Sequence, residues 1–106
     1  MGDRISIQFK NKEWLSVVLF SHWDGKGLLK EVEKYYAELK KGIQKSETPL
    51  DRLEPYTVMV DFIRHLTKNL KRVESNYHLG CTENDGDNDD NGHFVFDLEK
   101  GKWKRT

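Results

Sequence analysis

The spacing of apolar residues changes from a two-residue period to a helical period and back again, and this change limits the possible folds most. Residues 4–10 alternate between polar and apolar side chains, which predicts a half-buried strand. Residues 14–20 are nearly all apolar, so we predict a second strand in the middle of the sheet, covered on both faces. The pair Asn11-Lys12 between them is the predicted turn of an N-terminal hairpin.

Two amphipathic helices are predicted to follow this hairpin. Residues 28–45 carry one apolar stripe at helical spacing. Its members are Leu28, Val32, Tyr35, Leu39 and Ile43. Glu54-Pro55 starts the second helix, because proline in the first helical turn costs no hydrogen bond. The inner stripe of this helix is predicted to contain Tyr56, Met59, Ile63, Leu66 and Leu70.

The chain returns to strand spacing after the second helix. Residues 77–81 alternate as a third strand, in which Cys81 is predicted to be a small buried hydrophobe, and residues 94–98 alternate as a fourth. Trp103 anchors a short last strand, followed by a frayed tail over residues 104–106. We therefore expect a single α+β domain over residues 1–106. An N-terminal β-hairpin, two helices and a C-terminal β-hairpin would build a mostly antiparallel sheet with the helices on one face.

The composition limits the functional classes and the cellular compartments that we expect for this protein. The net charge is zero, with 18 basic and 18 acidic residues, which makes a dedicated nucleic-acid binder unlikely even though basic residues end both helices and surround Trp103. A single cysteine, Cys81, excludes an internal disulfide and favours a reducing compartment. No signal peptide or membrane-length apolar run is evident, so we expect a cytoplasmic protein without membrane association.

The acidic tract 83–92 contains the spacing Asp87-x-Asp89-x-Asn91-Gly92, which is the first half of a calcium loop. An EF-hand would need a glutamate at the twelfth position, but Leu98 stands there. A looser Ca²⁺ site on Asp87, Asp89 and Asn91 remains open, completed by Asp85 or Asp97. The alternative is a solvated hairpin loop between the third and fourth strands, because Asp, Asn and Gly are also turn residues.

A second candidate site is Ser21-His22-Trp23-Asp24-Gly25, at the end of the second strand. A two-residue hairpin turn would place Asp3 opposite Phe20, so that Asp3 and Arg4 lie beside His22 and Asp24. This cluster could bind a metal or phosphate, or could let His22 act as an acid or base oriented by Asp24. The structural alternative is that these side chains cap the turn, and it is favoured because no nucleophile with a fixed partner is evident.

These residues carry a resemblance to a known group of proteins. Met1-Gly2-Asp3-Arg4 and the later segment 19–25 resemble a family of small uncharacterised prokaryotic and phage proteins, in which a Ser/Thr-His-Trp segment follows the second strand. Leu79-Gly80, the Asp/Asn-rich turn and Asp97 are similar in outline. The resemblance implies a shared fold and emphasises Asp3, Arg4, His22 and Trp23, but it implies no activity. Asp24 departs from the glycine that is usual in the family.

Together these features predict a non-enzymatic binding protein that is associated with a mobile element and takes a protein partner. Its predicted surface consists of Asp3, Arg4, His22, Trp23 and Asp24. One alternative is a metal-dependent protein, either stabilised by Ca²⁺ in the acidic loop or acting as a small hydrolase through His22. A second alternative is weak nucleic-acid binding.

Overall fold

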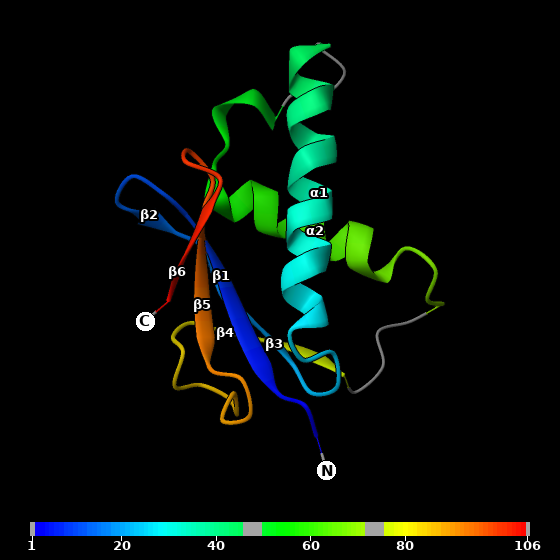
Figure 1. The fold of residues 1–106 in the computed structure, drawn as a ribbon, viewed down its shortest axis with the longest axis vertical. Helices are drawn as coiled ribbons and strands as arrows, with labels where there is room; N and C mark the ends of the chain where they lie inside the picture. The colour runs from blue at the N-terminus through cyan, green and yellow to red at the C-terminus, as the bar shows by residue number, and fades with distance from the viewer. Residues whose placement is uncertain (1, 46–49, 72–75, 106) are drawn as a thin grey trace.

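The computed structural model describes residues 2–45, 50–71 and 76–105. Within these residues the chain forms strands and helices in an α+β arrangement (Figure 1). In chain order they are β1 (Ile5–Asn11), β2 (Trp14–Leu15), β3 (Val18–Ser21), α1 (Gly27–Gln44), the 3₁₀ helix η1 (Leu50–Arg52), α2 (Pro55–Thr67), β4 (Tyr77–Gly80), β5 (His93–Asp97) and β6 (Lys102–Arg105). The predicted α+β class is confirmed.

The sheet has the strand order β4-β3-β1-β5-β6, and β2 pairs with the far end of β1. All neighbours are antiparallel except β1 and β5, which run parallel in the middle of the sheet. The sheet is therefore mostly antiparallel, as predicted. β4 and β6 end this strand order and β2 pairs only with β1, so each of these three strands has one free side among the described residues.

One apolar cluster joins the sheet to the helices. Ile5, Ile7 and Phe9 alternate onto the same face of β1, and all three are fully buried. The cluster also contains buried residues of α1 and α2, and both helices lie to the same side of the sheet in Figure 1. Phe9 packs edge-on against Phe62 of α2, with ring centroids 5.6 Å apart. Close packing of this kind stabilises the fold beyond the burial of apolar area alone.

The N-terminal hairpin forms, but with a different register from the predicted one. Its turn lies one residue later, where Lys12 adopts a left-handed backbone with φ of 56°, and Lys10 pairs with Leu15. Farther along, Ile5 pairs with Ser21, so the second strand contains one extra residue. This is a β-bulge. The expected pairing of Asp3 with Phe20 is therefore wrong.

The bulge also divides the predicted second strand into β2 and β3. Ser16 lies at the break, where its hydroxyl accepts the backbone N–H of Phe9 at 3.0 Å and donates to the Val17 carbonyl at 2.7 Å. β3 is fully buried, as expected of a central strand, whereas both residues of β2 are exposed. The prediction of one strand covered on both faces was wrong for residues 14–15.

The acidic tract connects β4 to β5, and these strands are not neighbours. Both run parallel to β1, so the segment between them is a crossover and not the predicted hairpin loop. We call residues 81–92 the acidic crossover. It crosses the sheet face opposite the helices, where Asn88 bonds Ser6 and where Phe20 stacks on His78 at 4.7 Å. Cys81 begins the crossover and is exposed, so the prediction that it is buried was wrong.

The predicted stripe of α1 is confirmed: Leu28, Val32, Tyr35 and Leu39 are buried, and Ile43 packs against the cluster. The predicted stripe of α2 is confirmed in part, because Met59 is buried and Ile63 and Leu66 pack against the cluster. The buried residues of α2 are Pro55, Val58, Met59 and Phe62, whereas Tyr56 and Leu70 are exposed, contrary to the prediction.

The predicted frayed tail is also wrong for residues 104–105, which belong to β6, while residue 106 lies outside the described residues. Within the described ranges, neither helix combines the length and apolar character needed to cross a membrane.

Candidate functional site

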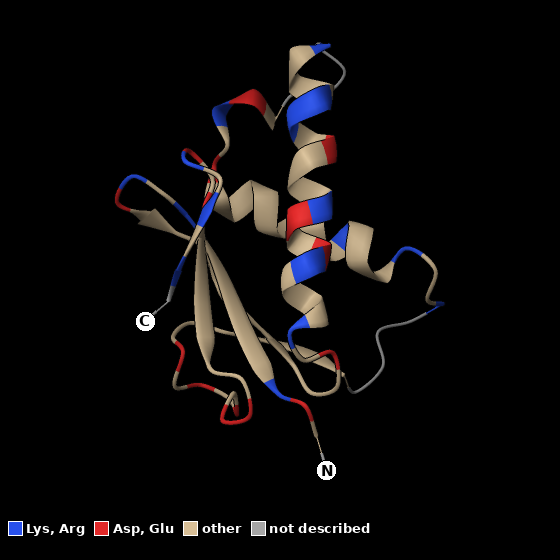
Figure 2. Cartoon of the chain, viewed as in Figure 1, with Lys and Arg blue, Asp and Glu red and all other residues tan. Residues whose placement is uncertain are grey.

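The structure brings the two candidate sites predicted from the sequence together at one end of the sheet. They are residues 21–25, which we call the His22 loop, and the acidic tract. Asp3 donates its backbone N–H to the carbonyl of His22 at 2.7 Å and accepts the N–H of Gly25 at 2.9 Å. The side chain of Asn91 donates to the Asp3 carboxylate at 2.7 Å. Figure 2 shows the acidic residues of the crossover gathered at this end of the sheet. Asp3, Arg4 and the His22 loop therefore adjoin the acidic crossover, despite the register difference.

Arg4 pairs with the acidic crossover. Its guanidinium forms an ion pair with Asp87 and lies 3.6 Å from Asp90. Its backbone N–H donates to the Asp90 carboxylate at 2.9 Å. The pKa of Asp87 is lowered, first by the hydrogen bond from the backbone N–H of Asp89 and then by Arg4. Charge within the cluster is thus largely compensated internally.

Asp24 holds the His22 loop against β4. Its carboxylate accepts hydrogen bonds from the hydroxyls of Ser21 at 2.9 Å and Tyr77 at 2.7 Å. Burial raises the pKa of Tyr77, and the bond to Asp24 raises it further. The side-chain oxygen of Asn76 accepts the backbone N–H groups of His22 and Trp23 at 3.0 and 2.9 Å. Asp24 therefore has the role of a structural anchor in this geometry.

The solvent-facing surface at this end of the sheet is aromatic. Trp23 is 56% exposed, and the ring of His22 contacts it edge-on at 4.3 Å. Asp3, Arg4 and Asp24 each have at least one side-chain partner within the fold, although the buried Nε of Arg4 forms no hydrogen bond among the described residues. The predicted binding surface is therefore spatially continuous, and Trp23 is its most accessible large apolar side chain.

The predicted calcium ligands lie close together in the chain, but the side chains of Asp87 and Asn91 already have internal bonds. One oxygen of Asp87 accepts the Asp89 N–H at 3.0 Å and the other faces Arg4. The amide nitrogen of Asn91 donates to Asp3 and to the Arg4 carbonyl. Among the described residues, no group of three or more His, Cys, Asp or Glu side chains is arranged to hold a metal ion. Calcium binding stays a prediction, which a Ca²⁺ titration followed by amide chemical shifts would test.

The two residues expected to complete the calcium site cap turns. Asp85 accepts the N–H groups of Cys81 and Thr82 at 2.7 and 2.8 Å, and these bonds lower the pKa of Asp85. Asp97 accepts the N–H groups of Glu99 and Lys100, both at 3.0 Å. These bonds are typical of Asx turns.

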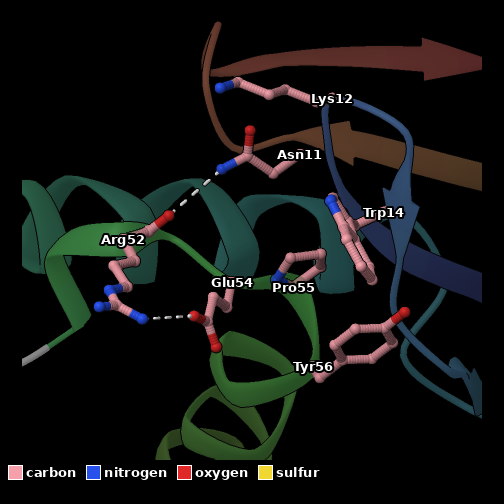
Figure 3. Close-up of a pocket in the computed structure, with 7 residues that line it drawn as sticks. All are labelled: Asn11, Lys12, Trp14, Arg52, Glu54, Pro55 and Tyr56. Carbon is pink, nitrogen blue, oxygen red and sulfur yellow. Dashed lines mark hydrogen bonds and ion pairs between the residues drawn. The ribbon is translucent and has the colours of Figure 1, made fainter.

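A pocket that the sequence did not reveal lies between the hairpin turn and the start of α2. We call it the Trp14–Tyr56 pocket; its volume is about 410 Å³. It is lined by Asn11, Lys12, Trp14, Arg52, Glu54, Pro55 and Tyr56 (Figure 3). The rings of Trp14 and Tyr56 meet edge-to-face at 6.1 Å, and the residues are 56% and 53% exposed. Two large aromatic residues are thus available to a ligand.

Backbone geometry on both sides builds this pocket. Trp14 directly follows the turn at Lys12 and precedes the bulge, which leaves β2 exposed. On the other side Leu53 adopts φ of 53°, and its carbonyl accepts the Asn11 amide at 3.0 Å. Ser16, a polar residue within an apolar run, was the only sequence signal of the break that exposes Trp14.

A second hollow lies between α2 and the edge strand β4. Its volume is about 220 Å³. It is lined by Leu19, Ile63, Leu66, Thr67, Tyr77, His78 and Leu79. This hollow and the Trp14–Tyr56 pocket lie along the same side of α2. That side carries Tyr56, Val60, Ile63 and Thr67, which recur at helical spacing. We call these four residues the α2 face. Val60 is 67% exposed and Leu79, across the hollow, is 55% exposed.

A buried serine–histidine pair, Ser6 with His93, serves the fold. Ser6 lies 2.7 Å from Nδ1 of His93, whose Nε2 lies 3.2 Å from the side-chain oxygen of Gln8. Burial lowers the pKa of His93, which favours the neutral ring. Ser6 is fully buried, so no substrate can reach its hydroxyl. The pair joins β1 to β5 and anchors the acidic crossover through Asn88.

The combined geometry describes a small domain with two accessible hollows on one side of α2 and an internally bonded polar cluster at one end of the sheet. No protein-family model, curated protein or solved structure matches this chain.

Proposed function

We propose that this protein is a non-catalytic protein-binding module that holds its partner along the α2 face, between the Trp14–Tyr56 pocket and the hollow beside β4. The observation that carries the proposal is the exposure of large apolar side chains there. Trp14, Tyr56 and Val60 are each more than half exposed. Exposed apolar surface of this kind marks interaction sites when it is contiguous, and aromatic residues dominate the energy of protein interfaces.

The chemistry of the pocket favours binding over catalysis. The ionic side chains at its rim are Lys12, Arg52 and Glu54. Arg52 and Glu54 lie 3.6 Å apart and are both exposed, whereas charged groups with catalytic roles are typically desolvated in a cleft. Apolar walls with a polar rim are typical of the centre of a protein interface.

Local charge favours a polypeptide over a nucleic acid. The cations Lys12 and Arg52 at the pocket are accompanied by the anions Glu13, Asp51 and Glu54. Nucleic-acid sites carry a clear excess of positive charge, because each phosphate contact requires a cation. A near-neutral aromatic pocket suits peptide side chains better.

The proposal is tested by selecting binders from a displayed library of random peptides and measuring their affinity by fluorescence anisotropy. We expect Trp14→Ala to weaken the selected peptides by about tenfold or more. Trp23→Ala is the matched control, because Trp23 has the same exposed fraction, 56%, at the other end of the molecule. Circular dichroism and urea unfolding establish that both variants fold.

Two outcomes would overturn the proposal. If Trp23→Ala weakens binding and Trp14→Ala does not, the binding surface is the predicted cluster around His22. If selection yields no peptide that binds the folded protein, the α2 face is not a peptide-binding surface.

A further inference from the structure

We infer that the partner binds as an extended segment that adds a further strand to the free side of β4, with alternate side chains entering the hollow beside α2. This inference rests on the proposed protein-binding function and specifies the conformation of the partner. β4 ends the strand order of the sheet, and its residues Tyr77, His78 and Leu79 line that hollow beside α2.

The hydrogen-bond pattern shows which backbone groups of β4 are available. The N–H of His22 bonds to the carbonyl of Asn76 at 2.9 Å. Antiparallel pairs alternate between bonded and non-bonded positions, so the bonded partners of β3 farther along are His78 and Gly80. The N–H and C=O groups of Tyr77 and Leu79 must therefore point away from β3. Neither residue has a backbone partner elsewhere in the described ranges.

The edge strands β4 and β6 are protected very differently. β6 carries Lys102 and Lys104 on one face, which is a common protection against pairing with other strands. β4 has the sequence Tyr-His-Leu-Gly, without a lysine, a carboxylate or a proline. Its central apolar residue, Leu79, is 55% exposed. An unprotected edge beside an apolar hollow has the features of strand addition, in which backbone bonds give affinity and side-chain hollows give specificity.

The part of β4 with which an added strand can pair ends before Cys81. The N–H of Cys81, immediately after β4, is bonded to the Asp85 carboxylate at 2.7 Å. The acidic crossover then leaves the edge and covers the opposite face, where Gly86 lies against Phe20 and His78. An added strand would therefore pair with Tyr77 and Leu79 and place alternate side chains on the α2 side, in the hollow.

Area and charge favour a peptide over a second copy of this chain. A stable dimer buries on the order of 800 Å² per partner, whereas a half-exposed leucine or valine supplies on the order of 100 Å² or less, and Leu79 and Val60 are the most exposed aliphatic residues here. Lys68 is exposed and directly follows Thr67, which lines the hollow. A peptide with apolar alternation and acidic flanks would complement this cation.

The test uses the synthetic peptide acetyl-Glu-Val-Thr-Ile-Thr-Val-Glu-amide and the same peptide with N-methylated Val, Ile and Val as its control. We expect hydrogen exchange of the Tyr77 and Leu79 amides to slow by about tenfold or more when the first peptide is added. His78 and Gly80 should change little, because they are already bonded to β3. The N-methylated peptide should protect neither Tyr77 nor Leu79.

Two variants at one position complete the design. Leu79→Lys places on β4 the type of residue that protects β6 and should weaken peptide binding by about tenfold or more, whereas Leu79→Val should retain binding. Because Leu79 is exposed, neither substitution should unfold the protein. If peptides bind through Trp14 while Tyr77 and Leu79 stay unprotected, the proposed function stands and strand addition is refuted. A dimer in sedimentation velocity that Leu79→Lys dissociates would replace the peptide by a second copy.

Discussion

Removing the hydroxyl of Ser6 should destabilise the fold by about 2 kcal/mol. Ser6 is fully buried on the sheet face opposite the helices. Its hydroxyl oxygen accepts a hydrogen bond from the Asn88 amide at 2.8 Å and lies 2.7 Å from Nδ1 of His93. In the neutral tautomer with the proton on Nε2, the Ser6 hydroxyl donates to Nδ1 and the ring donates to Gln8. Ser6→Ala removes the middle of this chain of bonds.

The expected magnitude follows from the groups left unpaired. A buried polar atom without a partner costs about 1–3 kcal/mol, and Nδ1 of His93 would be such an atom. The Asn88 amide keeps its second bond, to the carbonyl of Glu83 at 3.1 Å, so its contribution is smaller. A domain of this size is stable by about 5–15 kcal/mol, so a loss of about 2 kcal/mol is measurable and should still leave the protein folded.

Urea unfolding measures this loss as a shift of the midpoint by about 1 M. Thr67→Ala is the matched hydroxyl deletion: its hydroxyl donates at 2.7 Å to the Ile63 carbonyl, four residues earlier in the same helix. That variant should change stability by less than about 0.5 kcal/mol, because such bonds add little within a helix. In a double-mutant cycle with His93→Leu, the Ser6→Ala and His93→Leu effects should be coupled by about 1 kcal/mol or more.

A loss below about 0.5 kcal/mol for Ser6→Ala would refute this reasoning. It would mean that the acidic crossover is not anchored through Ser6, or that water replaces the missing hydroxyl. A full loss without coupling to His93 would mean that the loss does not come from the Ser6–His93 hydrogen bond.

Three further predictions concern the same end and face of the sheet. Because burial lowers the pKa of His93 below its usual 6.5, the folded state binds fewer protons than the unfolded one, so the melting temperature should be constant above about pH 6.5 and fall as the pH drops below it. Gly86→Ala should destabilise the protein by about 1–3 kcal/mol, since the new methyl group would lie 2.9 Å from the Phe20 ring, whereas Gly27→Ala, with no atom within 4 Å, should be neutral or stabilising in urea unfolding. Arg4→Gln should lower the melting temperature in dilute buffer, and the difference should shrink in 1 M NaCl, because the ion pairs of Arg4 are exposed and screened by salt; an unchanged difference in high salt would contradict this.

Local patterns predicted the elements whose packing is itself local. The alternation of Ile5, Ile7 and Phe9 predicted the buried face of β1, and the helical spacing in residues 28–43 predicted the buried side of α1. In these segments the apolar residues lie on one face, so only that face can be buried against the core. In α2 the apolar residues are spread more widely, and Tyr56 and Phe62 compete for the inner side. The core selects Phe62, because its ring fills the space against Phe9 and Tyr35.

The local sequence pattern did not predict which strands and side chains pair across long distances in the chain. The acidic crossover has the composition of a hairpin turn, and only the placement of β5 beside β1 makes it a crossover. The partner of His93 is Ser6, 87 positions earlier in the chain. The sequence did predict that Asp3, Arg4 and His22 meet, although through a different register. It gave no indication of the Trp14–Tyr56 pocket, which depends on a one-residue bulge and on a tertiary contact between Asn11 and Leu53.

The parallel pairing of β1 with β5 determines when the sheet can be completed during synthesis. β1 is made first, yet its neighbour in the middle of the sheet is formed by His93–Asp97. Until those residues leave the ribosome, one side of β1 has exposed backbone groups, and Ser6 lacks His93. We therefore expect the nascent chain to fold late, and the fold to form slowly for its size, because contacts of high sequence separation slow folding.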